Sequence, residues 1–339
     1  MKLWLLPMVA LSLVACTGNN GDKALTNYQQ RLARVLDTPL PNGDLAAPAP
    51  LLAERDLKQA LPDLRIDLTD AYASRRCGLD TLIGERNSSL GKVYSASKQL
   101  SYELRFLQQL AQCLQQRWDS DELLAQLQQV YQQKQLSIDI AFNNMLLTDD
   151  TLRKELLGIR KTLPLKDAPG YSETWQALSE LTRLQQLIAE QNWHAASQID
   201  IEQQLQRLYQ FNFVGRLQFS LRLSQHQLAQ LNAMLEQHNS TTLCPGGRDS
   251  EQLQILANIF GKYFIPEVQL YTVELSRYQQ QLWPLLQQLY QHTPLNTPLQ
   301  QRFEQHYDGM RTELSHHVTW WQNLNRQCPL ALNATVKGP

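Results

Sequence analysis

The residues best suited to chemistry lie together in one stretch, at the turn between two expected helices. Charged and amide side chains gather there in a chain otherwise rich in Leu and Gln: Arg76, Glu85, Arg86, Asn87, Lys92 and Glu103. In one interpretation this turn is a polar cleft. Its cations Arg76, Arg86 and Lys92 would bind an anionic group, and Glu85 or Glu103 would act as an acid or a base.

The favoured interpretation of the same turn is structural. The apolar stripe of the first helix continues from Leu79 and Ile83 onto Arg86, while Glu103 falls on the inner stripe of the second helix. A charge on an inner stripe needs a partner because burying it alone is costly. We therefore expect an Arg86–Glu103 pair, with Asn87 and two serines tying the turn. A surface patch for a protein partner is the third interpretation.

Catalytic motifs are incomplete. Two Ser-x-x-Lys matches, Ser89–Lys92 and Ser95–Lys98, have the spacing of penicillin-binding enzymes. Those enzymes also need a second Ser/Asn motif and a Lys-Thr-Gly strand, and here a Lys-Thr dipeptide is followed by Leu163. A non-enzymatic protein is therefore favoured over an enzyme.

Metal-binding patterns are equally incomplete. Glu313 and His316 give one Glu-x-x-His motif, whereas a helical di-iron site needs two of them and further carboxylates. We expect His316 and His317 to be solvated or at an interface. No CxxC or Cys/His spacing suits zinc. The sequence predicts no metal and no cofactor.

The first residues predict a lipoprotein signal peptide, residues 1–15. Lys2 precedes an apolar run, 3–14, which is too short to span a bilayer comfortably. The run ends in Leu13-Val14-Ala15-Cys16, which resembles the lipobox at which a diacylglycerol is attached to the cysteine thiol. Thr17, rather than Asp, follows the cysteine and favours sorting to the outer membrane. We expect a lipid anchor at Cys16, with the protein on the periplasmic face.

The four remaining cysteines suggest two disulfides, because an even number in an oxidising compartment indicates pairing. Three connectivities are possible. Cys77–Cys113 is favoured because it would join the two arms of one helical hairpin. Cys244–Cys328 is favoured because each of these residues lies in a loop before a proline.

Composition excludes a nucleic-acid footprint, since 31 basic residues are balanced by 32 acidic ones. Gln makes up about one residue in eight and sits inside Leu-rich helical patterns, which indicates neutral, solvated helix faces.

The expected fold is mainly α, with a helical domain and a small accessory antiparallel β-sheet. Period-two alternation predicts strands near 64–68, 136–142 and 216–223. Helices are expected over 22–36 and on both sides of the polar turn, with a Pro-rich strap over 38–50. The predicted organisation comprises the signal peptide, an anchor, helix and linker (16–52), one helical periplasmic domain (53–330) and a tail (331–339).

Several segments together resemble a gammaproteobacterial lipoprotein family, domain of unknown function 3080. They are the lipobox, Arg76–Leu79, Glu85–Lys92, Tyr102-Glu103 with Cys113, Leu243–Pro245, Lys262–Phe264 and Glu267–Gln269. The resemblance implies an envelope location and paired cysteines, and it adds no catalytic residue.

These observations predict a lipid-anchored protein that binds or organises another envelope component, with a protein of the envelope as its partner. The alternative is a periplasmic enzyme or small-anion-binding protein that uses the polar turn at 76–103.

Overall fold

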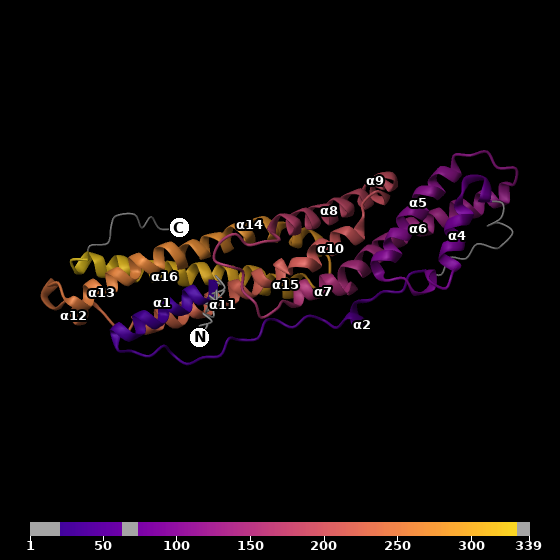
Figure 1. Ribbon diagram of the computed structural model, residues 1–339. Helices are drawn as coiled ribbons and strands as arrows, with labels where there is room; N and C mark the ends of the chain where they lie inside the picture. The colour runs from indigo at the N-terminus through magenta and orange to yellow at the C-terminus, as the bar shows by residue number, and fades with distance from the viewer. Residues whose placement is uncertain (1–20, 63–73, 331–339) are drawn as a thin grey trace, which may run out of the picture.

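The computed structural model describes residues 21–62 and 74–330, and it shows an elongated helical molecule (Figure 1). The longer helices are α1 (Gly21–Leu36), α4 (Leu79–Asn87), α5 (Ala96–Leu114), α6 (Asp121–Thr148), α7 (Asp150–Leu157), α8 (Tyr171–Ala189), α10 (Ile201–Phe211), α11 (Phe213–Leu235), α13 (Glu251–Ile259), α14 (Leu270–Tyr290) and α16 (His306–Gln327). Within these residues, no helix combines the length and apolarity that a bilayer-spanning segment requires.

Shorter helical pieces connect them. They are α2 (Glu54–Leu57), η1 (Ser74–Cys77), η2 (Gly91–Val93), α9 (Trp193–Ser197), α12 (Ser240–Leu243), η3 (Pro245–Gly247), α15 (Asn296–Gln300) and two π-helices, η4 (Phe260–Gln269) and η5 (Gln301–Gln305). Pro266 lies inside η4, whose wider turn suits a residue without an N–H. Pro284 also lies inside a helix, α14, which continues to Tyr290.

The main body surrounds α11, which packs along α16 and also contacts α1, α7 and α14. Helix α1 enters this core through Leu25, Tyr28 and Leu32, which recur every three or four residues and are at most 1% exposed. This confirms the helix expected over 22–36. Because its whole apolar stripe is buried against α11, α13 and η4, α1 belongs to the main body.

A second, smaller core forms the part that we call the arm: η1, α4, η2, α5 and the first half of α6. Its buried members are Cys77, Leu79, Tyr102, Phe106, Leu110, Cys113, Leu123 and Leu127. Figure 1 shows the arm projecting at one end of the molecule. Helix α6 joins the two cores, because its later residues, including Ile138 and Met145, are buried in the main body.

The predicted β-sheet is wrong: residues 136–142 lie in α6 and residues 216–223 lie in α11. The segment 64–68 is outside the described residues, and those residues contain no strand. In α11 the alternation misleads because the polar Gln218 and Ser220 are buried in the core, whereas the apolar Phe219 and Leu223 are only partly buried. In α6 the buried residues are Ile138, Ala141 and Phe142, a helical spacing, while Leu136 is 82% exposed.

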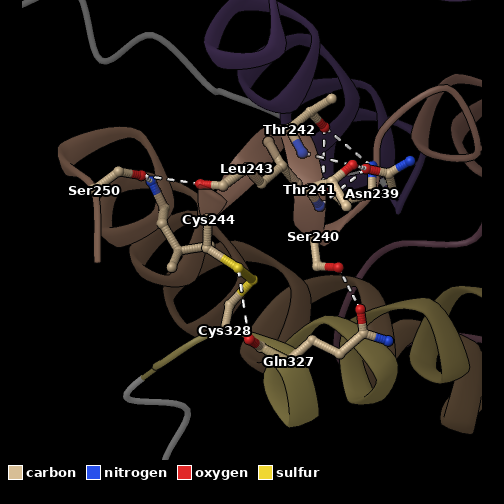
Figure 2. The surroundings of a disulfide bond; sticks show 10 residues. Asn239, Ser240, Thr241, Thr242, Leu243, Cys244, Ser250, Gln327 and Cys328 are labelled. Atoms are coloured by element: carbon tan, nitrogen blue, oxygen red, sulfur yellow. Dashed lines mark hydrogen bonds between the residues drawn. A yellow bond between two sulfur atoms is a disulfide. The ribbon is translucent and has the colours of Figure 1, made fainter. Parts of the chain in front are cut away.

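Both favoured cysteine pairs lie at disulfide distance. The Cα atoms of Cys77 and Cys113 are 5.4 Å apart, and those of Cys244 and Cys328 are 5.8 Å apart. Figure 2 shows the second pair, which fastens the end of α16 to the loop after α12. The Ser240 hydroxyl, which donates to the side chain of Gln327, joins the same two segments.

The strap, residues 38–53, follows α1 without regular secondary structure and crosses the main body toward the arm (Figure 1). Its apolar residues Leu40 and Leu51 are partly buried against the main core. The strap therefore connects two parts of one folded body.

A candidate ligand pocket in the arm

A cavity of about 940 Å³ lies in the arm, between α4, α5, α6 and residues 58–62. We call it the arm pocket. Polar and charged residues line one part of it: Lys58, Gln59, Arg86, Asn87, Lys92, Gln99, Glu103, Lys134 and Asn144. Apolar and aromatic residues line the rest: Ala60, Leu61, Pro62, Ile83, Tyr94, Ala96, Tyr102, Phe106, Val130 and Ala141. Four of the six residues singled out from the sequence therefore meet at this cavity.

Glu103 is paired, but its partner is Lys134 and not Arg86. The Lys134 Nζ atom lies 2.5 Å from the Glu103 Oε2 atom, and the side chains are 12% and 8% exposed. The Gln99 amide donates to the other carboxylate oxygen. Glu103 thus has the partner that its inner position requires, which leaves Arg86 available for another role.

Arg86 is half-buried at the pocket wall, where its Nη1 atom donates to the carbonyl of Gly91. Its guanidinium lies over the Tyr94 ring, 5.8 Å from the centroid. Gly91 is buried, and a Cβ atom there would clash with the backbone of α4. The tight turn that results, in which the Ser88 hydroxyl accepts from the Gly91 N–H, holds Arg86 in place.

Glu85 is fixed in its ionised form. Arg105 donates two hydrogen bonds to its carboxylate, at 2.6 and 3.0 Å, and the Tyr94 hydroxyl donates a third at 2.6 Å. The Arg105 hydrogen bond, followed by the Tyr94 one, lowers the pKa of Glu85. A carboxylate that is stabilised in this way is a poor general acid, and Glu85 does not line the pocket.

Arg76 lies apart from the pocket. Its Nη1 atom is 3.4 Å from the Asp119 carboxylate, and its guanidinium lies 5.3 Å from the Trp118 ring centroid. The six-residue cluster therefore divides into the pocket wall, the Glu85–Arg105 pair and this separate contact at the far end of α5.

The charges that line the pocket are unbalanced. Four cations line it, and Glu103 is the single carboxylate among its lining residues. Since Glu103 neutralises Lys134, the cations Lys58, Arg86 and Lys92 face the cavity beside aromatic rings. Burial raises the pKa of Tyr102 well above its usual value, so its phenol stays protonated. The pocket suits a ligand with an anionic group next to an apolar or aromatic part.

Nothing in the pocket assembles a nucleophile with a base. The Ser95 hydroxyl of one Ser-x-x-Lys match accepts from the backbone N–H of Lys98 and caps α5. Ser89 and Lys92 of the other match are both exposed.

Lys134 is the pocket residue that the sequence interpretation missed. It is one of a helical series of α6 residues, with Leu127, Val130, Tyr131 and Ile138, which face the arm or the body. A charge on the inner face of a helix is the same signal that singled out Glu103. The strand predicted from residue 136 interrupts this face just after Lys134, so the sequence interpretation did not follow it.

The histidines agree with the expectation at one position and differ from it at the other. His316 is exposed, but His317 is fully buried in the main body. The Tyr28 hydroxyl lies 2.9 Å from its Nε2 atom, and the Trp321 indole N–H donates to the same atom at 3.1 Å. Burial lowers the pKa of His317 to about 3, so the imidazole is a neutral part of the core.

Comparison with known proteins gives one match. A family described as a protein of unknown function, DUF3080, matches residues 25–332. No curated protein and no solved structure matches the chain.

Proposed function

We propose that this chain, which belongs to the DUF3080 family of proteins of unknown function, is a lipid-anchored envelope protein. In this proposal it binds an anionic ligand and catalyses no reaction. The observation that supports binding is the arm pocket, whose cations Lys58, Arg86 and Lys92 have no carboxylate of their own among its lining residues. The incomplete catalytic motifs support a non-enzymatic role.

The first residues and the cysteines support the proposed location. Leu13-Val14-Ala15-Cys16 supports lipidation at Cys16, Thr17 supports the outer membrane, and two cysteine pairs at disulfide distance suit the periplasm. Gly21 is five residues after Cys16, so the anchored lipid would lie within about 18 Å of the start of α1. Since α1 is packed into the main body, the anchor would hold that body close to the bilayer surface.

Titration calorimetry with 2-naphthoate tests the pocket, because this probe combines an aromatic ring with a carboxylate. We expect one binding site per chain, and about tenfold weaker binding in Arg86→Met and in Lys92→Met, since each variant removes a charge that would contact the carboxylate. Arg183→Met, at an exposed ion pair on α8, is the matched control and should bind like the wild type. The cationic analogue 2-naphthylmethylammonium should bind poorly. Equal affinity of both pocket variants and the wild type for 2-naphthoate would contradict the proposal.

Mass spectrometry tests the anchor. The mature chain should begin at Cys16 and carry the added mass of a diacylglycerol and an acyl chain. The Cys16→Ser variant should keep its signal peptide and remain an unprocessed precursor. An unmodified Cys16 in the mature protein would refute lipidation.

A second candidate function is recognition of an envelope protein at the tip of the arm. Leu90 is 77% exposed and Val93 is 76% exposed, which is unusual for aliphatic side chains this close together. A photo-crosslinking residue at Val93 should then capture a defined envelope protein in cells, whereas one at the exposed Glu236 should not. Equal labelling from both positions would argue against it.

A further inference from the structure

Three arginines converge in the main body where the strap crosses it, and none of them lines the arm pocket. They are Arg153 in α7, Arg222 in α11 and Arg302 in η5. The strap contacts two of them through backbone oxygens: Arg302 Nε donates to Ala49 at 2.6 Å, and Arg153 Nη2 donates to Leu52 at 2.8 Å.

Burial of this arginine cluster is deep. Arg302 is 3% exposed and Arg222 is 8% exposed. The Nη1 atom of Arg302 donates to the carbonyls of Leu156 and Leu157, at 2.9 and 3.1 Å. Only neutral oxygens therefore accept from Arg302.

Several N–H groups of the cluster have no acceptor. The Nε and Nη1 atoms of Arg222 and the Nη1 atom of Arg153 are buried without a hydrogen-bond partner. A buried donor without a partner is destabilising, and a charged donor is more so. Such a group calls for an acceptor that is not part of the chain itself.

The charge of the cluster is also not neutralised. In the part of the chain that the structure describes, no carboxylate forms an ion pair with Arg153, Arg222 or Arg302. Glu155 lies on α7 near Arg153, but it accepts from the N–H groups of Val214 and Gly215. Burial raises the pKa of Glu155 to about 8, so this carboxyl is largely neutral at pH 7.

The pKa values of Arg302 and His306 reflect the same excess of positive charge. Burial, followed by the charges of Arg222 and Arg153, lowers the pKa of Arg302 to about 10. Burial, Arg222 and Arg302 together lower the pKa of His306. Cations that are buried close together repel one another unless an anion lies between them.

We propose that Arg153, Arg222 and Arg302 bind a small oxyanion of the phosphate or sulfate class beneath the strap. Guanidinium groups present N–H donors in a fork that matches such oxygens, and three of them supply enough donors for a tetrahedral anion. The unpartnered N–H groups of Arg222 and Arg153 are the ones that would contact it. The bound anion would fasten α7, α11 and η5 together and hold the strap against the body. This site is separate from the arm pocket and does not depend on the proposed function.

Thermal unfolding and calorimetry of the full chain with inorganic phosphate test this proposal. Phosphate should bind saturably and raise the Tm above that in sodium chloride of the same ionic strength. Arg222→Met should weaken phosphate binding at least tenfold. Arg183→Met, at the exposed α8 ion pair, should leave phosphate binding unchanged.

Two results would overturn the proposal. One is a wild-type chain whose Tm responds equally to phosphate and to chloride at matched ionic strength. The other is an Arg222→Met variant that is more stable than the wild type and keeps the full phosphate response, which would mean that the charge was simply repelled by its neighbours. If Arg222→Met does not fold, Arg153→Met, at a partly exposed position, provides the same comparison.

Discussion

The Glu103–Lys134 ion pair allows the most direct test of how the arm pocket is built. The perturbations are Glu103→Gln, Lys134→Met and the double variant. Because both side chains are nearly excluded from solvent, each single change leaves a buried charge without its partner. Breaking a buried pair in this way costs about 3–5 kcal/mol. The double variant should lose much less than the sum, with a coupling energy of about 2 kcal/mol or more.

Urea unfolding followed by circular dichroism measures these differences, and hydrogen exchange of the α5 amides shows whether the arm opens separately. The exposed pair Arg183–Glu180, one helical turn apart on α8, is the control and should couple by less than about 0.5 kcal/mol. Single changes at Glu103 and Lys134 that each cost under about 1 kcal/mol would refute the reasoning. Both charges would then be sufficiently solvated, and Glu103 would be free to contact a ligand.

Three further predictions concern the rest of the chain. Because the pKa of His317 falls to about 3 on folding, the unfolded state binds an extra proton between that value and about 6.5, so stability should fall as the pH is lowered. This loss is about 2 kcal/mol at pH 5, and urea unfolding of His317→Gln should show a pH profile flatter by that amount; an unchanged slope would contradict it. Glu155 has the opposite sign: its pKa rises to about 8, so its stabilising contribution is complete below about pH 4.5 and is lost as the pH rises. Between pH 4.5 and pH 7 the free energy of unfolding of Glu155→Gln should rise by up to about 3 kcal/mol relative to that of the wild type. No relative change would mean that the Glu155 carboxyl is ionised in the folded protein. Replacing Cys244 and Cys328 with Ser opens a loop whose closure contributes about 4 kcal/mol on the chain-entropy model. The Tm should drop, and reductant should lower it by less than in the wild type because only Cys77–Cys113 remains to be reduced, whereas a Tm equal to that of the oxidised wild type would argue against a formed bond.

Features set by local spacing were predictable from the sequence. The stripe of Leu25, Tyr28 and Leu32 gave α1 because one face of the helix meets the core and the other meets solvent. Ser120 starts α6 because its side chain accepts from the backbone N–H of Leu123. The cysteine pairs also follow from local features, since Cys77–Cys113 joins the two arms of one helical hairpin and Cys244 and Cys328 each lie in a loop before a proline.

The sequence alone could not exclude the strand predicted over 216–223, because burial in this part of α11 does not follow the polarity of the residues. Around Gln218, Ser220 and Arg222 the polar positions of α11 are buried. Gln218 donates to the carbonyl of Leu156, and Ser220 donates to that of Arg216. The less buried positions of α11 in this stretch are the apolar Phe219 and Leu223, so hydrophobicity does not mark the outer face of the helix and the alternation fits a strand equally well.

The same burial hid the arginine cluster. Arg222 occupied an alternating polar position, which placed it on the solvent face of a predicted strand. The α11 helix turns it toward η5, where Arg302 comes from a distant part of the chain. No local spacing connects the two residues, so only the packing of α11 against η5 reveals an excess of positive charge.

The shape of the arm pocket, finally, depends on the links that stabilise the small core of the arm. The arm core has few buried side chains, and a core of that size gives little stability without a covalent or ionic link. Cys77–Cys113 ties η1 to α5, and Glu103–Lys134 ties α5 to α6. The Glu103–Lys134 pair lines the pocket beside Arg86, whereas the disulfide stabilises a more distant part of the arm, at η1 and the end of α5. Because a preorganised wall lowers the entropic cost of binding, we infer that the buried ion pair prepares the arm pocket for the anionic ligand proposed above.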